Sequence, residues 1–89
     1  GKKGFPVVSA DGRLKGVITL TDIRKAFEED KRDAVVRDVM TSDMLTLNPW
    51  DKADEAAQAF ERYDLVSAPV VSEDGHLLGR VTVAELIGS

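Results

Sequence analysis

Short apolar runs occur in two pairs along the chain, and each pair is separated by a polar turn. Residues 5–8 and 68–71 are apolar runs that predict β-strands. Asp11-Gly12 and Asp74-Gly75 follow them, and Asp-Gly favours a hairpin turn because glycine accepts a positive φ. A second predicted strand follows each turn, at residues 14–18 and 77–81. The pattern therefore predicts two β-hairpins.

Each predicted hairpin leads into a helix start signal. Thr19-x-x-Asp22 and Thr82-x-x-Glu85 fit the capping pattern in which two side chains satisfy the first free backbone N–H groups of a helix. These signals predict helices over residues 21–29 and 83–87, with a further short apolar turn or helix over residues 35–40.

A strand and a longer helix are expected between the hairpins. Residues 44–47 fit a strand, and Asn48-Pro49 follows, with asparagine suited to the N-cap and proline to the first helical position. Alanines and Phe60 then recur at helical spacing over residues 53–60. We therefore expect the helix to begin at Asn48-Pro49.

The two hairpin regions are copies of one unit. Residues 4–23 and 67–86 align at a constant offset of 63, and nine of their 20 positions are identical. The sequence predicts an α+β fold with a complete strand-helix-strand-strand-helix unit at 38–89. The first unit, at 1–37, has only strand, strand and helix, and we expect its opening strand and helix to be missing.

Composition excludes several classes of function. The 89 residues carry a net charge of −4, whereas a nucleic-acid binder needs a basic surface. No apolar run approaches the roughly 20 residues of a membrane span, so we expect no direct membrane insertion. The chain has one histidine, His76, and no cysteine, which argues against a zinc site and a Ser-His-acid triad. No phosphate-loop or dinucleotide motif is present, and we expect no enzyme activity.

In order and spacing, these motifs resemble a pair of CBS domains. The residues that carry the resemblance are Asp38-Val39-Met40-Thr41, Thr46-Leu47-Asn48-Pro49, Pro69-Val70-Val71 with Asp74-Gly75, and Gly79-x-x-Thr82, together with Phe5-Pro6-Val7-Val8, Asp11-Gly12 and residues 16–23. Residues 63–71 and 79–83 are similar to magnesium transporters of the MgtE type, and residues 18–48 to the cytosolic pair of bacterial chloride channels.

The resemblance implies a regulatory module. CBS domains pack as sheet-to-sheet pairs that often dimerise, and the cleft between the repeats binds AMP, ATP or S-adenosylmethionine, or in some members Mg²⁺. We therefore expect a cytoplasmic homodimer that senses an adenine nucleotide as part of a transporter, channel or enzyme. The alternatives are a Mg²⁺-sensing domain of a magnesium transporter and a dimerisation module without a ligand.

The resemblance also implies binding residues. It assigns the ribose hydroxyls to Asp22, with Thr19 beside it, although both residues equally fit a helix cap. For Thr82 and Glu85 the cap is the favoured interpretation, because the longer glutamate would misplace a ribose contact.

The remaining candidates flank the expected pockets. By the resemblance, the strand openings Gly4-Phe5-Pro6 and Ser67-Ala68-Pro69 border the adenine pocket, although an aromatic residue beside Pro-Val-Val is more often part of a core. Thr41 and Thr46 border the strand that lines the second pocket, and exposed strand positions are the simpler explanation for both. Carboxylates at residues 51–55 offer oxygen ligands for Mg²⁺, but solvated helix ends are the usual explanation, so we assign no metal ligand.

Overall fold

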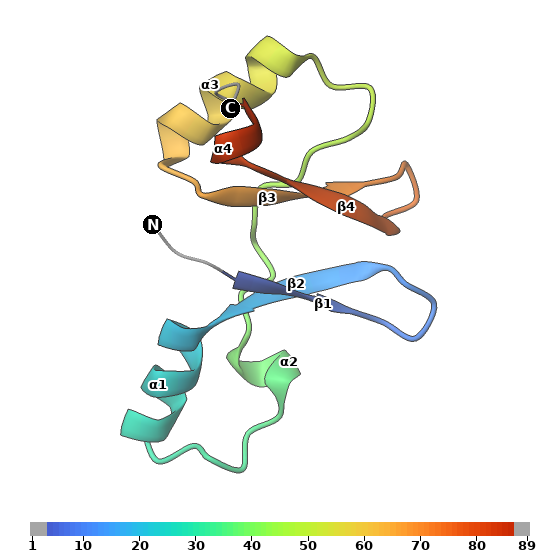
Figure 1. The fold of residues 1–89 in the computed structure, drawn as a ribbon. Helices are drawn as coiled ribbons and strands as arrows, with labels where there is room; N and C mark the ends of the chain where they lie inside the picture. Colours follow the sequence, from blue (N-terminus) through green and yellow to red (C-terminus); the bar gives the residue numbers. More distant parts are fainter. Residues whose placement is uncertain (1–3, 87–89) are drawn as a thin grey trace.

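Two β-hairpins lie face to face, and helices cover the outer side of each (Figure 1). The structure is a computed structural model that describes residues 4–86. The elements are, in chain order, β1 (Gly4–Val8), β2 (Leu14–Thr19), α1 (Leu20–Glu28), α2 (Val36–Val39), α3 (Ala53–Tyr63), β3 (Ser67–Val71), β4 (Leu77–Thr82) and α4 (Val83–Leu86). Both hairpins and the α+β class are confirmed, whereas Ile87, the expected end of the last helix, lies outside the described residues.

The repeat in the sequence is also a repeat in the backbone. β1 pairs with β2 and β3 with β4 in the same antiparallel register, so that Gly4 lies opposite Thr19 and Ser67 opposite Thr82. Both hairpins shift register after equivalent valines. The turn glycines Gly12 and Gly75 have φ values of 87° and 89°, a region that only glycine adopts freely. Identical turn residues thus produce identical hairpins.

The segment between α2 and α3 crosses from one sheet to the other. Val17 and Thr41 exchange backbone hydrogen bonds of 2.8 and 2.9 Å on β2. Leu47 forms a parallel bridge to Val70 on β3. The strand expected over residues 44–47 is therefore wrong in extent, because the chain leaves one sheet and joins the other before a ladder can form.

The start of α3 also differs from the expectation. Asn48 does not cap the helix, because its side-chain amide donates to the Val71 carbonyl at 3.0 Å and its backbone N–H donates to Asp51 Oδ2 at 2.8 Å. Residues 48–51 form a turn that ties the chain to β3, and the helix begins at Ala53 without a side-chain cap. Proline suits such a turn as well as a first helical turn, and sequence alone does not separate the two.

The hydrophobic core lies between α3 and the second hairpin. Its buried members are Leu47, Ala56, Phe60 and Ala68, with Phe60 only 3% exposed. The helix contributes Ala56 and Phe60, which are four residues apart and share one face. This core fixes α3 on the outer side of β3 and β4 and leaves their inner side toward the first repeat.

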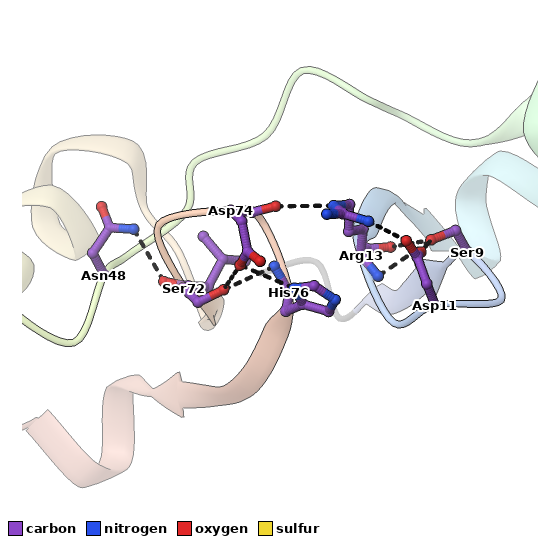
Figure 2. A network of polar contacts seen from close by, with 8 residues as sticks. Ser9, Asp11, Arg13, Asn48, Ser72, Asp74 and His76 are labelled. Atoms are coloured by element: carbon purple, nitrogen blue, oxygen red, sulfur yellow. Dashed lines mark hydrogen bonds and ion pairs between the residues drawn. The ribbon is translucent and has the colours of Figure 1, made fainter.

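The two hairpin turns are joined by reciprocal contacts. Leu14 N–H donates to the Gly75 carbonyl at 2.9 Å, and Leu77 N–H donates to the Gly12 carbonyl at 3.0 Å. Arg13 and His76 occupy equivalent positions and form the bridge between the turns. Figure 2 shows Arg13 reaching the Asp74 carbonyl, at 3.1 Å from Nε.

Polar side chains also link residues within each turn. His76 Nδ1 lies 2.9 Å from Asp74 Oδ1, and the Ser72 hydroxyl donates to the same carboxylate (Figure 2). Two hydrogen bonds hold the pKa of Asp74 well below its usual range, and the one with His76 has a larger effect than the one from Ser72. The equivalent network in the first turn joins Ser9, Asp11 and Arg13.

The lowered pKa of Asp74 predicts a stability change in acid. A carboxylate with a depressed folded-state pKa stabilises the fold above its unfolded pKa of about 3.9, and that contribution is lost as the pH falls through the folded value. We expect Asp74→Asn to lower the urea midpoint at pH 7 and to flatten its decline below about pH 4. Asp33→Asn, at an exposed position outside this network, is the matched control, and equal acid slopes in wild type and Asp74→Asn would contradict the account.

Close packing under β2 predicts different effects at two equivalent glycines. A Cβ at Gly16 would lie 2.7 Å from the Thr41 carbonyl oxygen and 2.8 Å from Met40 Sδ, whereas Gly79 has no heavy atom within 4 Å. We expect Gly16→Ala to lower the free energy of unfolding by about 1–3 kcal/mol through overpacking. Gly79→Ala should leave it nearly unchanged in urea titrations, and equal losses would show that the crossing segment is not closely packed on β2.

Candidate functional site

A large open cavity lies between the two hairpins. Its volume is about 1110 Å³, just above the usual range of about 300–1,000 Å³ for small-molecule pockets. Apolar side chains predominate, with a few polar groups among them. The lining residues are Gly4, Phe5, Pro6, Val17, Thr19, Thr41, Asp43, Met44, Leu45, Tyr63, Leu65, Ser67, Pro69, Leu77, Gly79 and Arg80.

The cavity brings together about half of the residues expected from sequence. Those that line it are Gly4, Phe5, Pro6, Thr19, Thr41 and Pro69. Asp22, Thr46 and Ala68 lie outside the lining, and Ala68 is only 2% exposed in the core. Successive residues of a strand point to opposite faces, so Ser67 and Pro69 face the cavity while Ala68 faces α3.

Thr19, which lines the cavity, forms a capping box with Asp22, which lies just outside the lining. Thr19 N–H donates to Asp22 Oδ2 at 2.9 Å, and Asp22 N–H donates to Thr19 Oγ1 at 3.1 Å. In the described part of the chain, neither Asp22 Oδ1 nor the hydroxyl hydrogen of Thr19 takes part in a hydrogen bond. The box caps α1 and keeps one carboxylate oxygen and one hydroxyl donor for another partner.

The equivalent box in the second repeat is closed on itself. Thr82 N–H and the Thr82 hydroxyl both donate to Glu85 Oε1, at 3.0 and 2.9 Å. Both hydrogen bonds lower the pKa of Glu85, and the one from the Thr82 backbone N–H has the larger effect. Neither residue lines the cavity. The two caps therefore differ in the way that their sequences differ, with glutamate reaching far enough to occupy the threonine hydroxyl.

Several lining residues were not expected from sequence. Arg80 and Val17 lie 63 positions apart and both line the cavity, so the repeat offset relates the two positions, although neither was a candidate from sequence. Asp43 and Tyr63 lie outside the repeated stretch, and no pattern in the sequence points to them.

Residues 4–86 were also searched for clusters of possible metal ligands and for helices that could span a membrane. In this range, no three histidine or acidic side chains gather where they could hold a metal ion together. None of the helices described here is long and apolar enough to cross a membrane.

Curated proteins with similar sequences are much longer than this chain. Inosine-5′-monophosphate dehydrogenase of Bifidobacterium longum is 35% identical over 85 residues, which cover 94% of this chain and 16% of that protein. The magnesium transporter MgtE of Enterococcus faecalis is 33% identical, over 91% of this chain and 17% of the transporter. The chain spans about a sixth of the length of these relatives.

Solved structures share the fold. One is the cytosolic domain of the Mg²⁺ channel MgtE, solved with ATP, which is 34% identical and has a TM-score of 0.81. The match covers 94% of this chain and 32% of the MgtE chain. A CBS domain pair solved with 5′-methylthioadenosine and S-adenosyl-L-methionine is 31% identical over 94% of this chain and 65% of its own, with a TM-score of 0.73.

The family profile agrees with the resemblance noted from the motifs. The profile described as CBS domain matches residues 2–29 and 36–89, which are nearly the whole chain. The repeated hairpins, the sheet-to-sheet arrangement and the cavity between the repeats agree with this match. The chain belongs to the CBS domain family.

Proposed function

We propose that this chain is a regulatory module of a larger protein and that it binds an adenosine-containing ligand in the cavity between its hairpins. The observation that carries the proposal is the open Thr19–Asp22 box, whose Thr19 lines a cavity of nucleotide size. The proposal is supported by related structures whose ligands, ATP and S-adenosyl-L-methionine, contain adenosine. The MgtE structure is of a cytosolic domain, which supports a cytosolic location for this module.

Each part of the ligand has a matching group in this proposal. Asp22 Oδ1 accepts hydrogen bonds from the ribose hydroxyls, since an ionised carboxylate offers about four acceptor sites and the cap uses one. Phe5, which is 65% exposed, stacks on the adenine base beside Pro6. Thr41 lines the same cavity at its bridge to β2 and adds a hydroxyl.

Regulation follows from the position of the cavity between two repeats. We propose residues 1–37 and 38–89 as the two units, joined by the crossing segment and the hairpin turns. A ligand that contacts both units stabilises one relative arrangement, and it shifts the equilibrium only by its difference in affinity between arrangements. The attached protein would respond to that shift.

The ribose contact is tested by a substitution that preserves the cap. Asp22→Glu keeps the capping box, since glutamate is favoured at this position, but moves the carboxylate and allows it to occupy the Thr19 hydroxyl, as Glu85 does with Thr82. We expect wild type to bind AMP or ATP in isothermal titration calorimetry. Asp22→Glu should weaken binding about tenfold or more, the effect of losing a hydrogen bond to a charged group.

The controls separate binding from folding and from metal sensing. Glu85→Ala removes the equivalent cap, which lies outside the cavity. It should lower the midpoint temperature of thermal unfolding without weakening nucleotide binding. Adenosine, S-adenosylmethionine and MgCl₂ complete the ligand panel. Stabilisation by MgCl₂ alone would replace the proposal with Mg²⁺ sensing, and no response to any ligand would leave a dimerisation module.

We further propose that two copies of the chain associate through α1. Leu20, Ile23 and Phe27 form an apolar stripe that is 58%, 38% and 55% exposed, and the neighbouring Val35 and Val36 are also exposed. Exposed apolar patches of this kind mark interaction surfaces, and two-fold dimers, in which the same surface of both copies meets, are the commonest homo-oligomers.

This association predicts a change in mass with substitutions on α1. The wild-type chain should elute as a dimer in size-exclusion chromatography with light scattering, and Leu20→Glu with Phe27→Glu should give a folded monomer. Lys25→Glu, on the same helix, should leave the dimer intact. A wild-type monomer at high concentration would contradict the proposal.

A further inference from the structure

The two hairpin turns meet at a pair of basic side chains, Arg13 and His76, which occupy equivalent positions of the repeat and form the bridge between the turns. Arg13 Nε donates to the Asp74 carbonyl oxygen at 3.1 Å (Figure 2). A Cβ at Gly12 would lie 3.5 Å from His76 Cδ2, so the imidazole lies against the first turn. Lys15, two residues further along β2, has the same charge as Arg13. The one histidine of the chain therefore lies opposite an arginine.

Each of these basic side chains also has a carboxylate partner within its own turn. Asp11 pairs with Arg13, and Asp74 Oδ1 lies 2.9 Å from His76 Nδ1. A hydrogen bond from Ser9 lowers the pKa of Asp11, and the hydrogen bond with His76 does the same for Asp74. Both carboxylates therefore stay ionised near neutral pH. Because each pair joins residues two positions apart, it persists whether or not the turns meet.

Protonation of His76 changes the charge that faces Arg13 across the bridge. With neutral His76, the second turn carries the negative charges of Glu73 and Asp74, and the positive end of the Asp11–Arg13 pair reaches toward it. His76 Nδ1 faces the Asp74 carboxylate and carries the proton of the neutral ring, so the added proton goes to Nε2. The protonated ring places a positive charge opposite Arg13, and like charges directly opposite each other destabilise an antiparallel pair.

We infer that the contact between the hairpin turns is a pH-sensitive clasp and that protonation of His76 loosens it. Histidine is the side chain that ordinarily exchanges its proton near neutral pH. The bonds at risk are those that Leu14 and Leu77 donate to the carbonyls of Gly75 and Gly12. When they loosen, the crossing segment still joins the two repeats, and the repeats can change their relative arrangement. The module would thus respond to acid without any ligand.

The size of the effect follows from the exposure of the two side chains. The Arg13 side chain is 43% exposed and that of His76 is 36% exposed, so water and salt screen the repulsion between them. Charge pairs at such positions change an equilibrium by about two- to fivefold. The clasp therefore shifts the balance between two arrangements and does not unfold the chain.

The test is amide hydrogen exchange on the 89-residue chain at about pH 7.5 and about pH 5.5, on either side of the ordinary histidine pKa, corrected for intrinsic exchange. We expect the protection factors of Leu14 and Leu77, whose N–H groups cross the clasp, to fall about two- to fivefold on acidification. The Leu47 N–H, which donates to the Pro69 carbonyl at 2.9 Å, reports on the crossing segment and should change little. Added salt should reduce the fall.

Three variants assign the response to the bridge. His76→Gln removes the ring that takes up the proton, and Arg13→Gln removes the charge opposite it, so each should give equal protection at both pH values. Arg24→Gln, on α1 away from the turns (Figure 1), removes the same charge as Arg13→Gln and should keep the wild-type response. The ¹H–¹⁵N spectrum of each variant shows whether it is folded.

Three results would overturn the clasp. The first is unchanged or increased protection of Leu14 and Leu77 at the lower pH in wild type. The second is a fall that persists in Arg13→Gln, because the repulsion requires that charge. The third is an equal fall at Leu47, which would mean that acid weakens the whole fold and not the contact between the turns.

Discussion

The cavity depends on the reciprocal backbone hydrogen bonds between the two hairpin turns. Leu14 donates to Gly75 and Leu77 donates to Gly12, and each carbonyl is presented by a glycine with positive φ. The turns meet while the strands behind them leave an open space between the sheets. An Asp-Gly pair that in isolation only predicts a tight turn thus also determines how two repeats are joined.

Sequence predicted the parts that are specified locally. Both hairpins, the caps of α1 and α4 and the apolar face of α3 follow from short patterns that each determine one element. The strand over residues 44–47 and the start of α3 were wrong because their backbone groups pair with distant residues. Leu47 forms a backbone bridge to β3, and the Asn48 side chain donates to the Val71 carbonyl instead of capping a helix. Neither partner is visible in a local pattern.

The candidate site was predictable where the repeat applied. Thr19 and Pro6 were identified from motifs, and the offset that revealed the repeat also relates Val17 to Arg80. Ala68 was placed in the site although strand alternation puts it in the core. Asp43 and Tyr63 reach the cavity through the crossing segment and the end of α3, and only the assembled structure brings them there.

We propose that an adenosine-containing ligand such as AMP occupies the space between the hairpins and contacts both repeats. It is tested most directly by following backbone amide chemical shifts in a ¹H–¹⁵N spectrum during titration with AMP. We expect concerted shifts at Thr19 and Asp22 in the first repeat and at Gly79 and Arg80 in the second. Shifts confined to one repeat, or to the outer helices, would contradict it.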